Sequence, residues 1–249
     1  MDKPGALNLK LEDYQEKGLY IILPDSSRLV LTKSNIENTA GEFWKDPARI
    51  PQYVKEAAEF QRCSFCPLKG IDELCDAIRP IFPFLGIIDK YVSFDEVVAI
   101  YKGEEKELLH LADTTMQDAL KFVSILSLTQ YCQIGRKYYR YYFGVVPIMK
   151  PKGMASRLYL NIYWLHKADK ESIAKLIKLF IEEMRITAQN QVKRLNLICK
   201  NDAFMNAFVN TQVVNEFLQM DIEKTVEASF NEFDQGARIY VKNRRGSDD

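Results

Sequence analysis

The chain has 249 residues, of which 47% are hydrophobic and 27% are charged, a composition typical of a globular protein with one sizeable core or two modest domains. Basic and acidic residues number 34 each, so no net charge attracts a polyanion such as duplex nucleic acid. Every apolar stretch is shorter than the roughly 20 residues that a membrane helix needs, so we expect no membrane partner.

The N-terminal third is predicted to contain strands followed by irregular structure. Residues 1–5 lack the positive and apolar regions of a secretory signal, so we expect a cytoplasmic protein. Residues 6–33 predict antiparallel strands, because two apolar runs flank the turn-forming residues 24–27. Residues 34–60 contain two prolines and several aromatic residues, which favours a connector with short helical turns that packs down by its rings.

The middle of the chain is predicted to hold a loop, a second hairpin and a helix. Prolines confine the loop of residues 62–89 to one short helix, over residues 72–78. Residues 94–111 predict a hairpin with its turn at residues 102–105. Cap-forming residues then precede a helix predicted over residues 115–132.

The C-terminal part is predicted to end in two helices. Aromatic and β-branched residues favour strands over residues 135–149 and 158–165. Apolar residues at helical spacing then predict a long helix from Asp169 to about residue 200. A second helix is predicted from Asp202 to residue 218, which completes a helical hairpin.

Together these elements predict an α+β fold. Its parts are N-terminal antiparallel strands, a cysteine-bearing loop, a second hairpin, a central helix and a C-terminal helical hairpin. We expect one structural unit over residues 1–249, β-rich over residues 6–111 and mainly helical over residues 112–240.

The cysteines give the strongest functional signal. Five is an odd number, which favours thiols or metal ligands over a disulfide framework. Cys63 and Cys66 form a Cys-x-x-Cys step, the spacing that places two thiolates on adjacent corners of a tetrahedral zinc site. Cys75 can fold back to the same point, and Cys132 ends the predicted central helix. We expect these four cysteines to hold a structural metal that anchors the loop to the helix.

Three alternatives remain open for the same cysteines. Four thiolates also suit an iron–sulfur cluster, and Pro67 after Cys66 resembles the Cys-Pro step of some ferredoxin-type clusters. A redox dithiol at Cys63 and Cys66 requires a lowered thiol pKa, for which Arg62 is the adjacent cation. With no cofactor at all, buried free cysteines behave as small apolar side chains.

The run Cys63-Ser64-Phe65-Cys66-Pro67-Leu68, with Cys75 and a later Cys132, resembles an uncharacterised bacterial protein family. Members carry a Cys-x-x-Cys-Pro-Leu motif after an N-terminal strand region, and a further cysteine ends a later helix. The resemblance covers about residues 20–222, and the family has no established activity. It implies that Cys63, Cys66, Cys75 and Cys132 form one set that excludes Cys199. Members usually have proline where this chain has Gln133.

A second candidate site lies in residues 136–143, where cations alternate with aromatic rings. Such a segment can stack bases and hold phosphates, as a binder of single-stranded nucleic acid does. We favour the alternative that the tyrosines pack inward, because the chain shows no basic excess. The residues in question are Arg136, Lys137, Tyr138, Arg140 and Tyr141.

No common catalytic motif occurs in the sequence, and His110 and His166 have no partner at catalytic spacing, so no reaction is predicted. The preferred hypothesis is a non-catalytic cytosolic interaction or regulatory protein, with zinc held by the four cysteines and a protein partner or self-association. A redox-active or iron–sulfur protein and a single-strand nucleic-acid binder are the alternatives.

Overall fold

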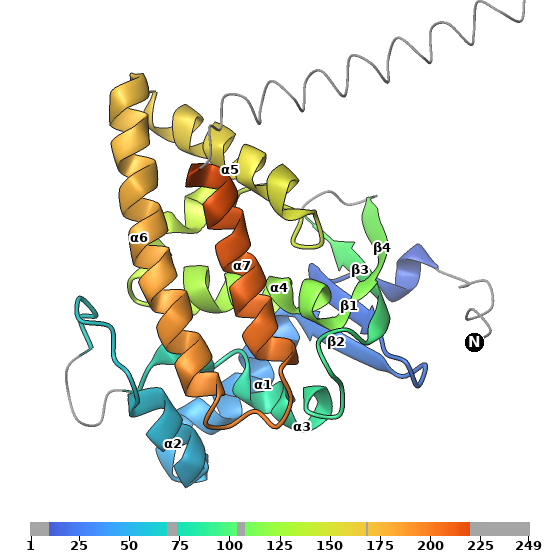
Figure 1. The fold of residues 1–249 in the computed structure, drawn as a ribbon. Coiled ribbons are helices and arrows are strands. Elements are labelled where there is room, and N and C mark those ends of the chain that lie inside the picture. Colours follow the sequence, from blue (N-terminus) through green and yellow to red (C-terminus); the bar gives the residue numbers. More distant parts are fainter. Residues whose placement is uncertain (1–9, 69–73, 104–107, 168, 220–249) are drawn as a thin grey trace, which may run out of the picture.

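The computed structural model in Figure 1 describes residues 10–68, 74–103, 108–167 and 169–219. An antiparallel sheet lies to one side of a group of helices, with helix α4 (Met116–Leu126) between them. Helix α4 contacts the sheet and also packs against α7 (Ala203–Gln219), which contacts α5 (Pro151–His166) and α6 (Lys170–Leu195). The predicted α+β class, with strands first and helices last, is confirmed.

The sheet has the strand order β2-β1-β3-β4, and all neighbouring strands are antiparallel. The two predicted hairpins therefore lie side by side. Their strands are β1 (Gly18–Ile22), β2 (Arg28–Thr32), β3 (Glu96–Lys102) and β4 (Leu109–Thr115). The second hairpin's turn falls partly outside the described residues, which lack 104–107.

The prediction of strands from residue 6 onward is wrong before β1. Residues 6–9 lie outside the described part, and Leu11–Asp13 form a short 3₁₀ helix, η1. The polar run of residues 15–17 breaks the alternation that a half-buried strand requires. Strand β1 begins at Gly18, whose φ of 150° and close approach to the Thr32 backbone exclude a side chain.

The connector after β2 is more helical than the sequence indicated. Instead of short turns, residues 33–45 form a full helix, α1 (Lys33–Lys45), because Thr32 caps its start by accepting the Asn35 N–H. Two of its rings pack down as predicted, with Phe43 edge-on to Phe82 at 5.0 Å between centroids and Trp44 beside the same ring. The prediction is wrong for Tyr53 and Phe60, which are exposed. Further helices are η2 (Pro47–Arg49), α2 (Gln52–Glu59), η3 (Asp76–Ile78), η4 (Phe82–Phe84) and α3 (Leu85–Ile88).

The predicted short helix over residues 72–78 falls partly outside the described chain, and its last residues form η3. The prediction that the loop of residues 62–89 holds one short helix is wrong, because η4 and α3 also lie within it. The central helix is confirmed as α4 followed by a π-helical turn, η5 (Ser127–Tyr131). The strands predicted over residues 135–149 and 158–165 are wrong. The first of these segments begins with a 3₁₀ helix, η6 (Gly135–Tyr142), and the second lies within α5.

Tertiary packing explains this change from strand to helix. Tyr138 and Tyr141 are three residues apart, one 3₁₀ turn, and both reach the core. Helix α5 has Pro151 in its first turn and buries Leu158 and Ile162, which are four residues apart. Burial of one helical face therefore outweighs the β-propensity of the aromatic and branched residues.

The C-terminal helical hairpin of α6 and α7 is confirmed. Asp169 caps α6 by accepting the Ser172 N–H at 3.0 Å. The Asp202 carboxylate, expected to cap α7, accepts the Ser93 N–H and hydroxyl, each at 2.9 Å, and the Asn206 amide at 2.8 Å. It therefore ties the turn between the helices to the loop before β3.

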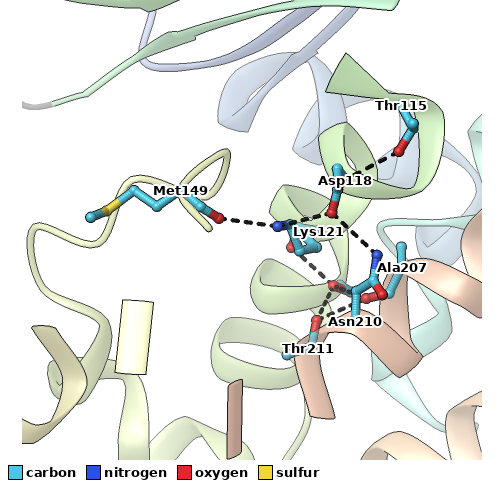
Figure 2. Close-up of polar contacts among 8 residues, drawn as sticks. Thr115, Asp118, Lys121, Met149, Ala207, Asn210 and Thr211 are labelled. Carbon is cyan, nitrogen blue, oxygen red and sulfur yellow. Dashed lines mark hydrogen bonds and ion pairs between the residues drawn. The ribbon is translucent and has the colours of Figure 1, made fainter. Parts of the chain in front are cut away.

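One buried cation joins α4 to its neighbours (Figure 2). The Lys121 side chain is 2% exposed, and its ammonium donates to Met149 O at 3.1 Å and pairs with Asp118 at 3.1 Å. Asp118 also accepts the Asn210 amide from α7 at 3.2 Å. A buried charge requires such a partner.

Within the described ranges, no helix has the length and apolar character to cross a bilayer.

Candidate functional site

The structure brings the four predicted cysteines together around one small cavity of about 20 Å³. Cys63 and Cys66 lie in the loop after α2, Cys75 precedes η3, and Cys132 follows η5. With Ala77 and Ile134 they form a cluster separate from the main core. The cavity has room for about one water-sized body. Cys199, which the family resemblance left outside the set, packs against the main core instead.

Backbone bonds fix the loop that carries Cys63 and Cys66. Gln61 has a positive φ of 50°, which turns the chain sharply away from α2. The Cys66 N–H donates to Cys63 O at 2.9 Å, so a tight turn places both thiols on one side. The Cys75 N–H donates to Ala58 O at 3.4 Å, which returns the far end of the loop to α2.

The π-helical turn η5 positions Cys132. Its N–H donates to Ser127 O at 2.9 Å, the five-residue step of a π turn. The Ser127 hydroxyl donates to Ala77 O at 2.6 Å and so joins this turn to the residues after Cys75. Gly135 is required because a Cβ there would lie 1.8 Å from Leu128 O. The chain can therefore fold back toward Cys132 only with glycine at this position.

Nitrogen donors surround the sulfur atoms. The Ala77 N–H donates to Cys75, and the N–H groups of Ile134 and Gly135 donate to Cys132. The Asn190 amide donates to Cys63 Sγ at 3.4 Å. Hydrogen bonds of this kind stabilise the charged form of a sulfur ligand.

Burial opposes ionisation of the thiols in the absence of a metal. It raises the pKa of Cys75, although the Arg194 guanidinium acts in the opposite direction. Burial also raises the pKa of Cys132 to about 11, and the nearby Cys75 and Cys63 add to this shift. Cys75 and Cys132 are therefore neutral at pH 7. A reactive dithiol requires a lowered pKa, so these two lack the property that redox chemistry needs.

The thiols do not stand in a finished coordination sphere. In the part of the chain that the structure describes, no three His, Cys, Asp or Glu side chains are placed so that they could hold a metal ion. The cavity and its donors are formed, whereas binding would require the ligand atoms to move closer together.

One face of α6 completes the wall of the cavity, and sequence reasoning missed it. Thr187, Gln191 and Arg194 border the cavity. Arg194 is 2% exposed and donates to Phe60 O at 2.8 Å, to Gln61 O at 2.7 Å and to Gln191 Oε1 at 3.2 Å. Polar residues at helical spacing within the otherwise apolar face of α6 were the available signal.

The segment of residues 136–143 is a 3₁₀ helix whose tyrosines divide between core and surface. Tyr138 and Tyr141 are buried against Phe180, with centroid distances of 5.0 and 5.4 Å. The Tyr138 hydroxyl donates to Glu183 at 2.8 Å, and Lys137 pairs with the same carboxylate at 2.6 Å. These two rings are not available to stack on bases.

The two arginines of this segment are exposed. Arg136 donates to Gln130 O at 2.9 Å, and Arg140 donates to the Tyr139 hydroxyl at 3.1 Å. Of the tyrosines in residues 138–141, Tyr139 is the exposed one. The aromatic surface on which bases could stack is therefore smaller than the sequence predicted. Nucleic-acid binding by this segment stays a prediction.

Comparisons with models of protein families, with curated proteins and with solved structures give no match to this chain.

Proposed function

We propose that Cys63, Cys66, Cys75 and Cys132 bind one zinc ion as a structural site in a non-catalytic cytosolic interaction or regulatory protein. The observation that carries the proposal is the convergence of four thiols, from three separate segments, on one atom-sized cavity. Thiolates are preferred zinc ligands, and four of them complete a tetrahedral sphere.

The size of the cavity favours a single ion over a cluster. About 20 Å³ accommodates one atom, whereas an iron–sulfur cluster also brings its own sulfide ions. The surrounding N–H donors suit anionic sulfur, since a metal ion deprotonates its thiol ligands. Both features are those of a mononuclear thiolate site.

A structural role fits a site with four protein ligands. Four protein ligands leave no open position for substrate, unlike catalytic zinc sites with three. The ion would join the loop after α2 to η3 and to the end of η5, segments that lie apart in the sequence. Its binding energy would then contribute to folding.

A protein partner or self-association completes the proposal. Large aromatic side chains are unusually exposed, with Phe94 at 72%, Phe143 at 69% and Trp164 at 68%. Aromatic residues of this kind are enriched in protein interfaces.

Elemental analysis of protein purified without oxygen or chelator, with an absorption spectrum of the same sample, tests the site. We expect about one zinc per chain and no colour. Iron with visible absorption would replace the zinc proposal by the iron–sulfur alternative. Absence of metal, together with unchanged stability of Cys63→Ser and Cys66→Ser, would overturn it. Cys199→Ser is the matched control and should leave the metal content unchanged.

A further inference from the structure

We infer that Arg194 is the built-in counter-ion of an anionic tetrathiolate metal site, with Asn190 and Gln191 as donors to its sulfur atoms. This inference rests on the proposed function and assigns α6 a part in it. The three residues present one face of α6 to the cysteine cluster.

The main observation is a buried positive charge that has no negative partner among the described residues. Arg194 is 2% exposed, and a guanidinium stays protonated in proteins. Its donors are bound to two carbonyls and one amide oxygen, and none of the ion pairs between described residues includes it. Lys121, which is equally buried, is paired with Asp118 (Figure 2).

The charges around the cavity have the sign that an anionic site needs. Arg62 and Arg194 both border it, and Asp76 is the one carboxylate of its described lining. The Asp76 carboxylate also accepts the Gln133 amide at 2.8 Å. The buried Arg194 guanidinium contributes a positive charge to this wall, whereas four thiolates around a divalent ion are doubly negative. Metal binding would therefore supply the anion that the buried guanidinium lacks.

Two amides of α6 add neutral donors. The Asn190 amide already donates to Cys63 Sγ at 3.4 Å. Gln191 is fully buried, and its Nε2 has no hydrogen-bond partner among the described residues although the side chain borders the cavity. A buried donor without an acceptor lowers the stability of the fold. A thiolate sulfur in the cavity would give Gln191 Nε2 the acceptor that it lacks.

Arg194 also joins the metal site to the fold. Its bonds to the carbonyls of Phe60 and Gln61 hold the start of the Cys63–Cys66 loop against α6. A test must therefore separate the charge of Arg194 from its role as an anchor. Arg194→Lys keeps the charge and Arg194→Gln removes it, while both lose the paired hydrogen bonds to the carbonyls of Phe60 and Gln61.

The experiment is a titration of the full chain with Co²⁺, followed through cobalt–thiolate absorption, with Zn²⁺ affinity measured by competition. We expect Arg194→Gln to bind each metal about 10- to 100-fold more weakly than wild type, the range for residues that support metal ligands. Arg194→Lys should recover most of that loss. The matched control is Lys193→Gln, which removes a neighbouring charge that is exposed and should leave both affinities unchanged.

Equal losses in Arg194→Lys and Arg194→Gln, or no loss in either, would overturn the counter-ion and leave the zinc site standing. A wild-type chain that binds neither Co²⁺ nor Zn²⁺ would overturn the proposed function and the inference together. If Arg194→Gln does not fold, Asn190→Ala gives the second test, because it removes the donor to Cys63 Sγ without disturbing Arg194. Its metal affinity should fall, and an unchanged value would refute the role of α6.

Discussion

Alkaline pH should destabilise the metal-free protein through its buried thiols, among them that of Cys132. Burial raises its pKa from 9.0 to about 11, so between these values the unfolded chain releases a proton that the native state keeps. The stabilising contribution is complete below pH 9.0 and is lost as the pH rises toward 11. Two pKa units correspond to about 3 kcal/mol of unfolding free energy.

This magnitude needs little discount for solvent, because Cys132 is 7% exposed. Urea unfolding with chelator present, from about pH 8 to about pH 11, would measure it for wild type and Cys132→Ala. Other groups that titrate in this range, including several tyrosines, are common to both proteins and cancel in the difference. The wild type should lose up to about 3 kcal/mol more than the variant across the window.

Parallel loss of stability in the two proteins would refute the burial argument for Cys132. Cys199→Ala serves as a comparison, because burial raises the Cys199 pKa from 9.0 to about 12, so its loss begins at the same pH as that of Cys132 and continues above pH 11. Saturating zinc should remove the alkaline loss of stability that is due to Cys132 in the wild type, because a metal-bound Cys132 thiolate has already released its proton.

Three further predictions concern stability. Zinc at about 100 times its dissociation constant should raise the unfolding free energy by about 2.7 kcal/mol, measured by thermal unfolding, and Cys66→Ser should abolish that gain. Gly135→Ala should cost about 2 kcal/mol or more in urea unfolding, because its Cβ would meet Leu128 O at 1.8 Å, while Gly86→Ala, with open space, should cost nothing. Asp118→Asn should lower the unfolding free energy by about 1 to 2 kcal/mol, because Lys121 loses its ion pair but Asp118 is 38% exposed and solvent screens the pair. An unchanged midpoint of urea unfolding would show that the hydrogen bond to Met149 O is enough to stabilise the Lys121 ammonium.

The sequence was enough to predict the secondary structure of segments whose apolar residues recur with one clear helical or strand period. The apolar spacing of α6 and α7, the hairpin of β1 and β2, and the central helix ending near Cys132 were all predictable, because each buries one face against the core. Residues 135–142 and 151–166 were not, since their aromatic and branched residues favour a strand locally. Contacts of Tyr138 and Tyr141 with Phe180 make the helical arrangement the better one.

The candidate site also has a part that the sequence predicted and a part that it did not. Cysteine identity and spacing are enough to mark Cys63, Cys66, Cys75 and Cys132 as a set, because metal ligation depends on residue type and reach. Their polar neighbours on α6 gave no comparable signal. Thr187, Gln191 and Arg194 recur at helical spacing beside the apolar residues of α6, a weak signal, and all three are almost fully buried.

The sequence by itself determined the α+β class, the order of the main elements and the four thiols as candidate ligands, because these depend on local periodicity and side-chain chemistry. Only the tertiary structure decided that the thiols share one cavity and that Arg194 lies beside them as a buried charge outside any described ion pair. The physical reason is that burial and charge pairing are properties of packed elements. They arise when α6 closes over a loop more than a hundred residues earlier in the chain.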